Sequence, residues 1–345
     1  MPGARPGAQS AGRKYSGGNR RPAGRTGRRI AGRTAGRTAL TDPGLSPAGR
    51  GWRARGTRTG KFKKPGYGEA FGRLGHVTFP VIGVVGGGQL ARMMAPAATA
   101  LGFELRVLAE GEDVSAVSAV ANAPVGDYTD LDHLLEFSRG LDVLTFDHEH
   151  VPTEHLRSLQ RAGVNVHPGP DALVNAQDKL VMRAAIDRLE LPNPRWASVA
   201  DVAGLIAFGD DTGWPVVLKT PRGGYDGKGV RIVDSAADAA DAADWFEAMS
   251  PLLAEAKVEF SRELSALVAR TPDGEARAWP VVHTIQVDGV CDEVIAPALD
   301  IPLEVAAAAE NAALRIASEL GVTGVMAVEL FETPGVGAGF LINEL

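Results

Sequence analysis

The residues best suited to chemistry lie in one short stretch, in which a lysine ends an apolar run and a glycine-rich loop follows. Residues 216–218 predict a buried strand that ends at Lys219, and a buried cation is costly without an anionic partner. The following Gly223-Gly-Tyr-Asp-Gly-Lys-Gly229 lets several backbone N–H groups face one anion. Lysines at both ends of such a loop favour a polyphosphate ligand. A surface hairpin with solvated lysines remains the alternative, and the chain has no G-x-x-x-x-G-K-[ST] loop.

Two carboxylates late in the chain arise from apolar runs. Glu329 lies in a predicted strand over residues 325–331, and Glu344 lies in another over residues 340–345. A turn rich in glycine and proline joins them, so the two acids should pair across a hairpin. Buried carboxylates need a cation, and with Asn343 they offer the oxygen ligands that Mg²⁺ takes beside nucleotide phosphates. The alternative is that both acids point to solvent from an edge strand.

A weaker pattern precedes the strand that we expect to begin near Glu263. The backbone groups of the four residues before it could meet the edge of an adenine ring, and the Glu263 carboxylate could hold a ribose hydroxyl. These four residues are Glu255, Ala256, Lys257 and Val258.

Gly86-x-Gly88-x-x-Ala91 follows an apolar run and opens a predicted helix, as in dinucleotide-binding proteins with alanine in third place. Glu110, at the end of the next predicted strand, falls near the position of the acid that binds ribose. A phosphate or other ligand, a dinucleotide and plain turn geometry all remain open. The seven histidines lack metal-ligand spacing, and no Ser/His/Asp or Cys/His nucleophile set can be argued.

The alternation of strands and helices expected around these residues predicts an α/β fold, with a parallel sheet in its first part. The expected strands of that part are residues 80–85, 103–108, 123–125 and 143–146, and its expected helices end at residue 100 or span 131–139 and 153–162. A helix over residues 177–189 leads to a second α/β region, which contains a helix over residues 304–320 and the two late strands.

Composition divides the chain into parts of opposite charge. Residues 1–75 hold 18 Lys and Arg against 2 Asp and Glu, whereas the other 270 residues hold 18 basic and 40 acidic residues. We expect residues 1–76 to be a disordered Arg/Gly-rich extension, which is inert, binds RNA or acts as a transit peptide. The single Cys291 excludes an internal disulfide and a thiolate zinc site. Without a membrane-length apolar run or a secretory signal, the chain is predicted to be cytoplasmic.

From about Val81 to Leu345 the chain resembles the ATP-grasp superfamily, and within it the carboxyaminoimidazole ribonucleotide synthase family. The order and spacing of seven segments support the resemblance: Gly86-Gly-Gly-Gln-Leu-Ala-Arg-Met93, Thr145-Phe-Asp-His-Glu-His-Val151, Gln177-Asp-Lys179, Lys219 with the 223–229 loop, Phe260-Ser-Arg-Glu-Leu-Ser265, Trp279-Pro-Val-Val282 and Asn343-Glu344. It implies a Rossmann-like pre-ATP-grasp domain over residues 77–171. A two-part ATP-grasp domain follows over residues 172–345, with a lid over about 196–257.

The resemblance also implies an activity. Members of this family carboxylate aminoimidazole ribonucleotide with bicarbonate, ATP and magnesium, in purine biosynthesis, and they are usually dimers. Phosphoryl transfer to bicarbonate needs charge neutralisation and positioning, and no protein nucleophile. A membrane partner is not expected, because the chain lacks an apolar run of membrane length, and a nucleic acid partner is not expected either.

Site residues follow from the same resemblance. The phosphates of ATP would contact Lys179 and Lys219 and lie under a flap formed by Gly223, Gly224, Tyr225, Asp226, Gly227, Lys228 and Gly229. Adenine and ribose would be held by residues 255–258 and Glu263, and magnesium by Glu329 and Glu344, with Asn343 beside them. Bicarbonate and the ribonucleotide would face Tyr225, Asp226 and Lys228, and the ribonucleotide also Gln89 and Glu149.

The chain departs from the family pattern at a few positions. Val174 and Gln286 stand where many relatives have an arginine and a histidine, and Asp147 replaces the commoner glutamate. Relatives continue past the Asn-Glu pair into a substrate-binding run and a small C-terminal domain, so we expect a C-terminally truncated chain with weak or no turnover. The alternatives are another ATP-grasp ligase, such as a formate-dependent ribonucleotide transformylase, and an inactive fragment with an RNA-binding tail.

Overall fold

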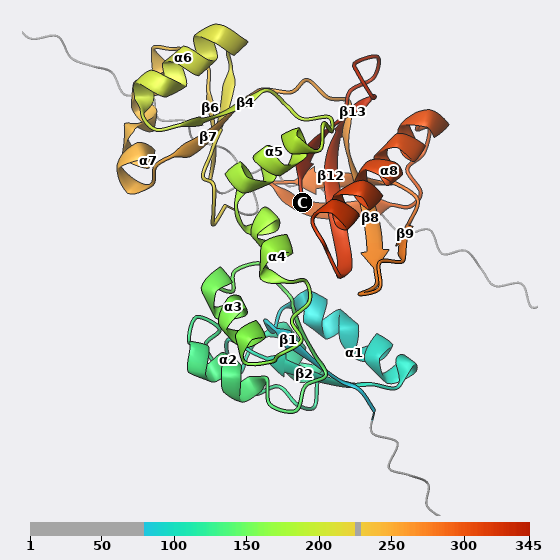
Figure 1. Cartoon of the computed structure of the whole chain (residues 1–345). Coiled ribbons are helices and arrows are strands. Elements are labelled where there is room, and N and C mark those ends of the chain that lie inside the picture. The colour runs from blue at the N-terminus through green and yellow to red at the C-terminus, as the bar shows by residue number, and fades with distance from the viewer. Residues whose placement is uncertain (1–78, 225–228) are drawn as a thin grey trace, which may run out of the picture. The chain divides into compact units, whose positions relative to one another are not determined.

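The computed structural model describes residues 79–224 and 229–345, whose elements are shown in Figure 1. The predicted extension over residues 1–76 and the loop residues Tyr225, Asp226, Gly227 and Lys228 lie outside the described residues. The described residues fall within one unit of contacts and form three sheets. None of their helices is long and apolar enough to cross a membrane.

The first sheet is parallel, as predicted. Its strands are β1 (Val81–Val85), β2 (Glu104–Leu108) and β3 (Val143–Phe146), in the order β2-β1-β3. Alternate side chains of β1 point to opposite faces: Val84 packs with Ala91 of α1 (Gln89–Leu101). Val85 belongs to a second cluster, which includes residues of α2 (Leu131–Phe137) and α3 (Thr153–Arg161). Helices therefore cover both faces of this sheet.

The predicted strand over residues 123–125 is wrong. The segment makes only isolated parallel bridges, Arg106 with Asn122 and Ala109 with Val125. Pro124 has no N–H group to donate to a ladder, and Gly126 follows at once, so the pairing does not extend.

The predicted helix over residues 177–189 is confirmed as α5 (Lys179–Arg188). A further helix, α4 (Pro170–Gln177), was not predicted; it ends before Asp178, and α5 begins after it. The Asp178 carboxylate accepts hydrogen bonds from the N–H groups of Leu180 and Val181, at 3.0 and 3.3 Å. Asp178 is therefore the N-cap of α5, and it makes Lys179 the first residue of that helix.

A four-stranded antiparallel sheet follows, in the order β4-β7-β5-β6. Two helices, α6 (Val202–Thr212) and α7 (Ala243–Ala248), contribute side chains to its apolar cluster. The strands are β4 (Trp196–Val199), β5 (Val216–Lys219), β6 (Val230–Val233) and β7 (Leu252–Ala256). Lys219 is the last residue of β5 and pairs with Val230 of β6, so the predicted strand ending in a lysine is confirmed.

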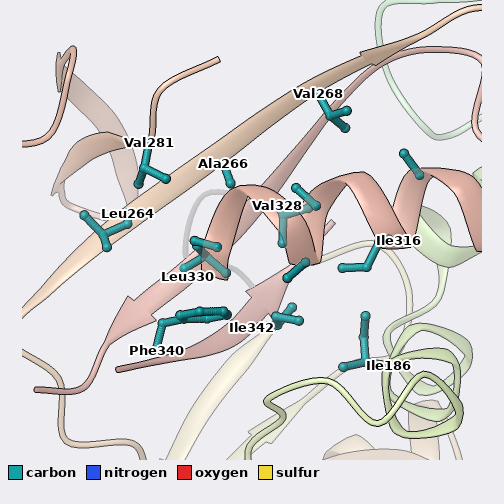
Figure 2. Packing of buried hydrophobic residues seen from close by; sticks show 14 of the residues in the cluster. Ile186, Leu264, Ala266, Val268, Val281, Ile316, Val328, Leu330, Phe340 and Ile342 are labelled. Carbon is teal, nitrogen blue, oxygen red and sulfur yellow. The ribbon is translucent and has the colours of Figure 1, made fainter. Parts of the chain in front are cut away.

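The third sheet has its path in the order β11-β10-β8-β12-β13, with β9 paired to β8. Its strands are β8 (Arg262–Arg270), β9 (Ala276–Ala278), β10 (Val282–Val287), β11 (Val290–Ile295), β12 (Gly324–Glu332) and β13 (Phe340–Glu344). Figure 2 shows α8 (Leu303–Glu319) packed on this sheet through Ile316, with Val328, Leu330 and Ile342 in the same apolar cluster. The predicted helix and hairpin near the end of the chain are confirmed.

Candidate active site

One cavity, of about 640 Å³, is lined by residues of α5, of strands in the second and third sheets, and of the segments that connect them. It gathers most of the described residues that the sequence singled out, from α5, β5, β7, β8, β12 and β13. They are Glu149, Lys179, Lys219, Gly224, Glu255, Ala256, Lys257, Val258, Glu263, Glu329, Asn343 and Glu344. Gln89, Gly223 and Gly229 do not line it.

The anionic partner that Lys219 requires is Glu255. The Lys219 ammonium lies 2.7 Å from Glu255 Oε2 and donates to Asn343 Oδ1 at 3.3 Å. The other carboxylate oxygen of Glu255 pairs with Arg183. Burial raises the pKa of Glu255, but the positive charges of Lys219 and Arg183 outweigh that effect and hold it below its ordinary value. The sequence assigned only the backbone of Glu255 a role, and it did not single out Arg183.

Carboxylates from β12 and β13 line another part of the cavity wall. Glu329 faces Glu344 in the register of β12 and β13. Burial first, then the negative charges of Glu344 and Glu263, raise the pKa of Glu329, although Lys179 and Lys219 oppose them. Lys179 forms an ion pair with Glu344. Both acids line the cavity, where Glu329 is exposed and Glu344 is half-buried on the edge strand β13, so they face a solvent-accessible cavity rather than a closed core.

Oxygen donors for a cation are thus present in this wall. No group of three or more His, Cys, Asp or Glu side chains with metal-binding geometry occurs among the described residues. Two facing carboxylates and an amide oxygen fit a Mg²⁺ ion that completes its shell with water and substrate phosphates. The raised pKa of Glu329 fits the same ion, because a cation would offset the excess negative charge.

An apolar wall completes the cavity, and sequence reasoning missed it. Val217, Ile232, Phe260 and Phe331 line it together with the backbone at residues 256–258. The rings of Phe260 and Phe331 stack with centroids 4.4 Å apart. The available signal was the alternation of apolar side chains in the strands, which places one set of side chains on each face.

The glycine-rich turn at the start of α1 is filled by the chain's own carboxylates. Asp147 Oδ1 accepts from the Ala91 N–H at 3.1 Å, and Glu110 Oε2 accepts from the Gly87 N–H at 2.9 Å. A Cβ at Gly88 would lie 2.2 Å from Asp147 Oδ2. Since internal anions use the amides that a pyrophosphate would need, turn geometry is favoured over a dinucleotide site.

A smaller cavity, of about 160 Å³, lies beside the residues that follow β3. Glu149 lines both cavities. Gln177 Nε2 donates to the Glu149 carbonyl at 2.7 Å, and the Arg222 guanidinium lies 2.9 Å from Asp178 Oδ2. Gly223 also lines this cavity. Gln89 is exposed and lines neither cavity, so the structure does not bring it to the candidate site.

Comparisons with known proteins agree with this arrangement. Residues 79–177 match the ribonucleotide synthetase preATP-grasp domain, and residues 184–345 match the ATP-grasp domain. Relatives named N5-carboxyaminoimidazole ribonucleotide synthase include that of Mycobacterium bovis, 50% identical over 77% of this chain and 62% of its own length. The one from Pseudomonas aeruginosa is 36% identical over 76% and 71%. The chain thus spans about 62% of the length of the mycobacterial relative.

Solved structures show the same likeness. An ADP complex of N5-carboxyaminoimidazole ribonucleotide synthetase superimposes with a TM-score of 0.71 and 32% identity, over 77% of this chain and 70% of that one. The synthase from Aspergillus clavatus, in complex with ADP and 5-aminoimidazole ribonucleotide, gives a TM-score of 0.68 and 27% identity over 77% and 69%. The resemblance inferred from the sequence motifs is confirmed: this chain belongs to the N5-carboxyaminoimidazole ribonucleotide synthase family of ATP-grasp proteins.

Proposed function

We propose that the chain provides the ATP site of an enzyme that carboxylates 5-aminoimidazole ribonucleotide to its N5-carboxy derivative, in de novo purine biosynthesis. The observation that carries the proposal is the meeting of Lys179 and Lys219 with the facing acids Glu329 and Glu344 in one cavity. Relatives that share the fold are named for this product, and one solved relative holds ADP and the ribonucleotide.

The chemistry asks little covalent work of the protein. The γ-phosphoryl group of ATP passes to a bicarbonate oxygen, which leaves ADP and carboxyphosphate. Carboxyphosphate releases phosphate and CO₂, and the exocyclic amine attacks the carbon and loses a proton. Lys179 and Lys219 supply fixed positive charge for the first step. Glu329 and Glu344, with Asn343, would hold Mg²⁺, which supplies further positive charge at phosphate oxygens when bound.

The remaining walls fit the rest of the nucleotide. Val217, Ile232 and Phe331 offer an apolar slot of the kind an aromatic base enters. Backbone groups at residues 256–258 would bind the adenine edge, and Glu263 would bind a ribose hydroxyl. Burial raises the pKa of Glu263, and a hydrogen bond with Gln286 offsets part of that rise.

Other parts of the proposal rest on the family resemblance alone. These are the bicarbonate and ribonucleotide contacts of Tyr225, Asp226 and Lys228, and a homodimer; a ribonucleotide contact of Glu149 is also supported by its place in both cavities. The domain boundaries at residues 77–171 and 172–345, with a lid over about 196–257, belong to the same proposal.

The test is ADP formation by the purified chain with Mg²⁺, ATP and bicarbonate, with and without aminoimidazole ribonucleotide. We expect slow ADP release that depends on the ribonucleotide, with carbon from labelled bicarbonate incorporated into the ribonucleotide product. Lys219→Met should abolish the signal, whereas Arg195→Met, which removes an exposed surface cation paired with Asp211, should not. Dependence on formate instead of bicarbonate would favour a transformylase, and no ribonucleotide dependence would overturn the proposal for this chain.

A further inference from the structure

Arg183 has one of the largest side chains among the fully buried residues that the structure describes. None of the steps proposed above uses it. It lies on α5, about one turn after Lys179. Charged side chains are almost never fully buried unless partners satisfy their charge and their hydrogen-bond donors. The position of Arg183 therefore calls for an explanation in terms of what it pairs with.

The guanidinium joins three segments that meet at the cavity. Its Nε pairs with the Glu255 carboxylate of β7. Nη1 donates to the Ile342 carbonyl at 2.7 Å and to Asn193 Oδ1 at 2.8 Å, and Nη2 donates to the Asn343 carbonyl at 2.9 Å. These bonds turn its donors toward the protein interior. Arg183 does not line the cavity, so it can act on a ligand only through its neighbours.

Its principal neighbour is a carboxylate shared between two cations. Glu255 contacts Arg183 through one oxygen and Lys219 through the other. One carboxylate and two cations leave a net charge of +1 on this group. Two of its members, Lys219 and Glu255, line the cavity, so the Lys219 ammonium is the cation that a ligand there would meet. Without Arg183, Glu255 and Lys219 would form a neutral pair.

We propose that Arg183 is a positioning residue of the nucleotide site, which neutralises Glu255 so that Lys219 keeps a net positive charge toward a polyphosphate. This inference rests on the nucleotide site of the proposed function. It assigns the buried arginine an electrostatic effect that grows with the charge of the ligand. A purely structural arginine would affect charged and uncharged ligands alike.

Four variants separate these two roles: two change the net charge of the Arg183–Glu255–Lys219 group, one restores it and one is a control. Arg183→Met leaves a net charge of zero, and Arg183→Met with Glu255→Gln restores +1 without a stranded carboxylate. Glu255→Gln alone gives +2. Arg188→Met is the matched control, because Arg188 is exposed near the end of the same helix. The measurement is the affinity for ATP and for adenosine by titration calorimetry, with circular dichroism to verify folding.

The ratio of ATP to adenosine affinity should follow the net charge. We expect it to fall at least about tenfold in Arg183→Met, the size of effect that loss of a nearby unit charge can produce. It should return to within about threefold of the wild-type ratio in the double variant. Glu255→Gln should equal or exceed the wild-type ratio, and Arg188→Met should match it.

Equal losses for ATP and adenosine in Arg183→Met, or a low ratio in the double variant, would overturn the inference. Removing one partner of a buried ion pair is strongly destabilising. If Arg183→Met does not fold, the double variant and Glu255→Gln decide the question, since neither strands a buried carboxylate. If the ratio of ATP to adenosine affinity follows the net charge across the variants, but the wild-type chain forms no ADP with the ribonucleotide, the inference stands and the proposed function is overturned. A wild-type chain that binds no ATP would overturn both.

Discussion

Glu329 lies directly opposite Glu344 across the β12–β13 hairpin, and both carboxylates line the same cavity. Two acids in this relation repel each other, and Lys179 pairs with only one of them. The arrangement weakens the ligand-free protein at neutral pH and prepares an oxygen-rich place for a cation. Its properties can be measured without any turnover.

The first prediction concerns Glu329→Gln and pH. The raised pKa of Glu329 means that the folded state holds this proton more tightly than the unfolded state does. Its contribution to stability is therefore complete below the ordinary glutamate pKa of 4.5 and is lost as the pH rises through the raised value. Glu329→Gln should raise the ligand-free Tm at pH 7 and flatten its pH dependence.

The same variant should lose its response to magnesium. Mg²⁺ should raise the Tm of the wild-type chain with bound ATP and should raise that of Glu329→Gln much less. ADP formation should fall about 100-fold, as for removal of one electrostatic group from an active site. Glu319→Gln, an exposed acid on α8, is the control. An unchanged magnesium response in Glu329→Gln would show that the cation binds elsewhere.

A second prediction concerns the apolar wall. Phe260→Ala removes the ring that stacks on Phe331, and we expect binding of ATP and of adenosine to weaken together by about three- to tenfold. The equal loss distinguishes the base subsite from the phosphate subsite. Val336→Ala, an exposed residue in the hairpin turn, should change neither affinity. A loss confined to ATP would place the adenine elsewhere.

The turn at the start of α1 gives a third prediction. Gly88 has an extended backbone, with φ of −73°, that alanine can adopt, so the expected cost of Gly88→Ala is steric. Its Cβ would push Asp147 away from the helix N-terminus, and unfolding in urea should show a loss of about 1–3 kcal/mol. Gly111→Ala, where the new Cβ meets nothing within 4 Å, should be near neutral. Adding Asp147→Ala to Gly88→Ala should recover part of the loss.

A fourth prediction uses the single cysteine as a probe. Cys291 is exposed on β11 and lines the cavity, and the chain has no other cysteine. A colourimetric thiol reagent should therefore react with one group per chain, and ATP with Mg²⁺ should slow that reaction. Inorganic phosphate at the same concentration should not. Equal reaction rates with and without ATP would mean that the nucleotide leaves β11 uncovered.

The sequence predicted those parts of the site that depend on short-range chemistry. A lysine ending an apolar strand requires an anion, and Lys219 has one; two acids joined by a short turn must face each other, and Glu329 and Glu344 do. The anion itself was not predictable, because Glu255 reaches Lys219 only through the pairing of β5 with β7. Arg183 was missed because an arginine on a helix normally points to solvent, and only tertiary packing buries it.

For the fold too, features that depend on local sequence patterns were predicted better than those that depend on tertiary pairing. The alternation of strands and helices indicated the parallel first sheet, whereas the strand expected at residues 123–125 was wrong because Pro124 interrupts pairing. The helix expected over residues 177–189 is present as α5, whereas α4 was not predicted, although Pro170 at its first position is a helix-start signal.

The base of the glycine-rich loop is tied down on both sides. Thr220 N–H donates to the Gly229 carbonyl at 2.9 Å, and Lys179 N–H donates to the Pro221 carbonyl at 2.9 Å. Thr220 follows Lys219 directly, and Lys179 is itself the donor to Pro221, so these two bonds link the backbone segments that carry both lysines of the cavity. The spacing of the two lysines is therefore set by the main chain, and it should persist in variants that replace either side chain.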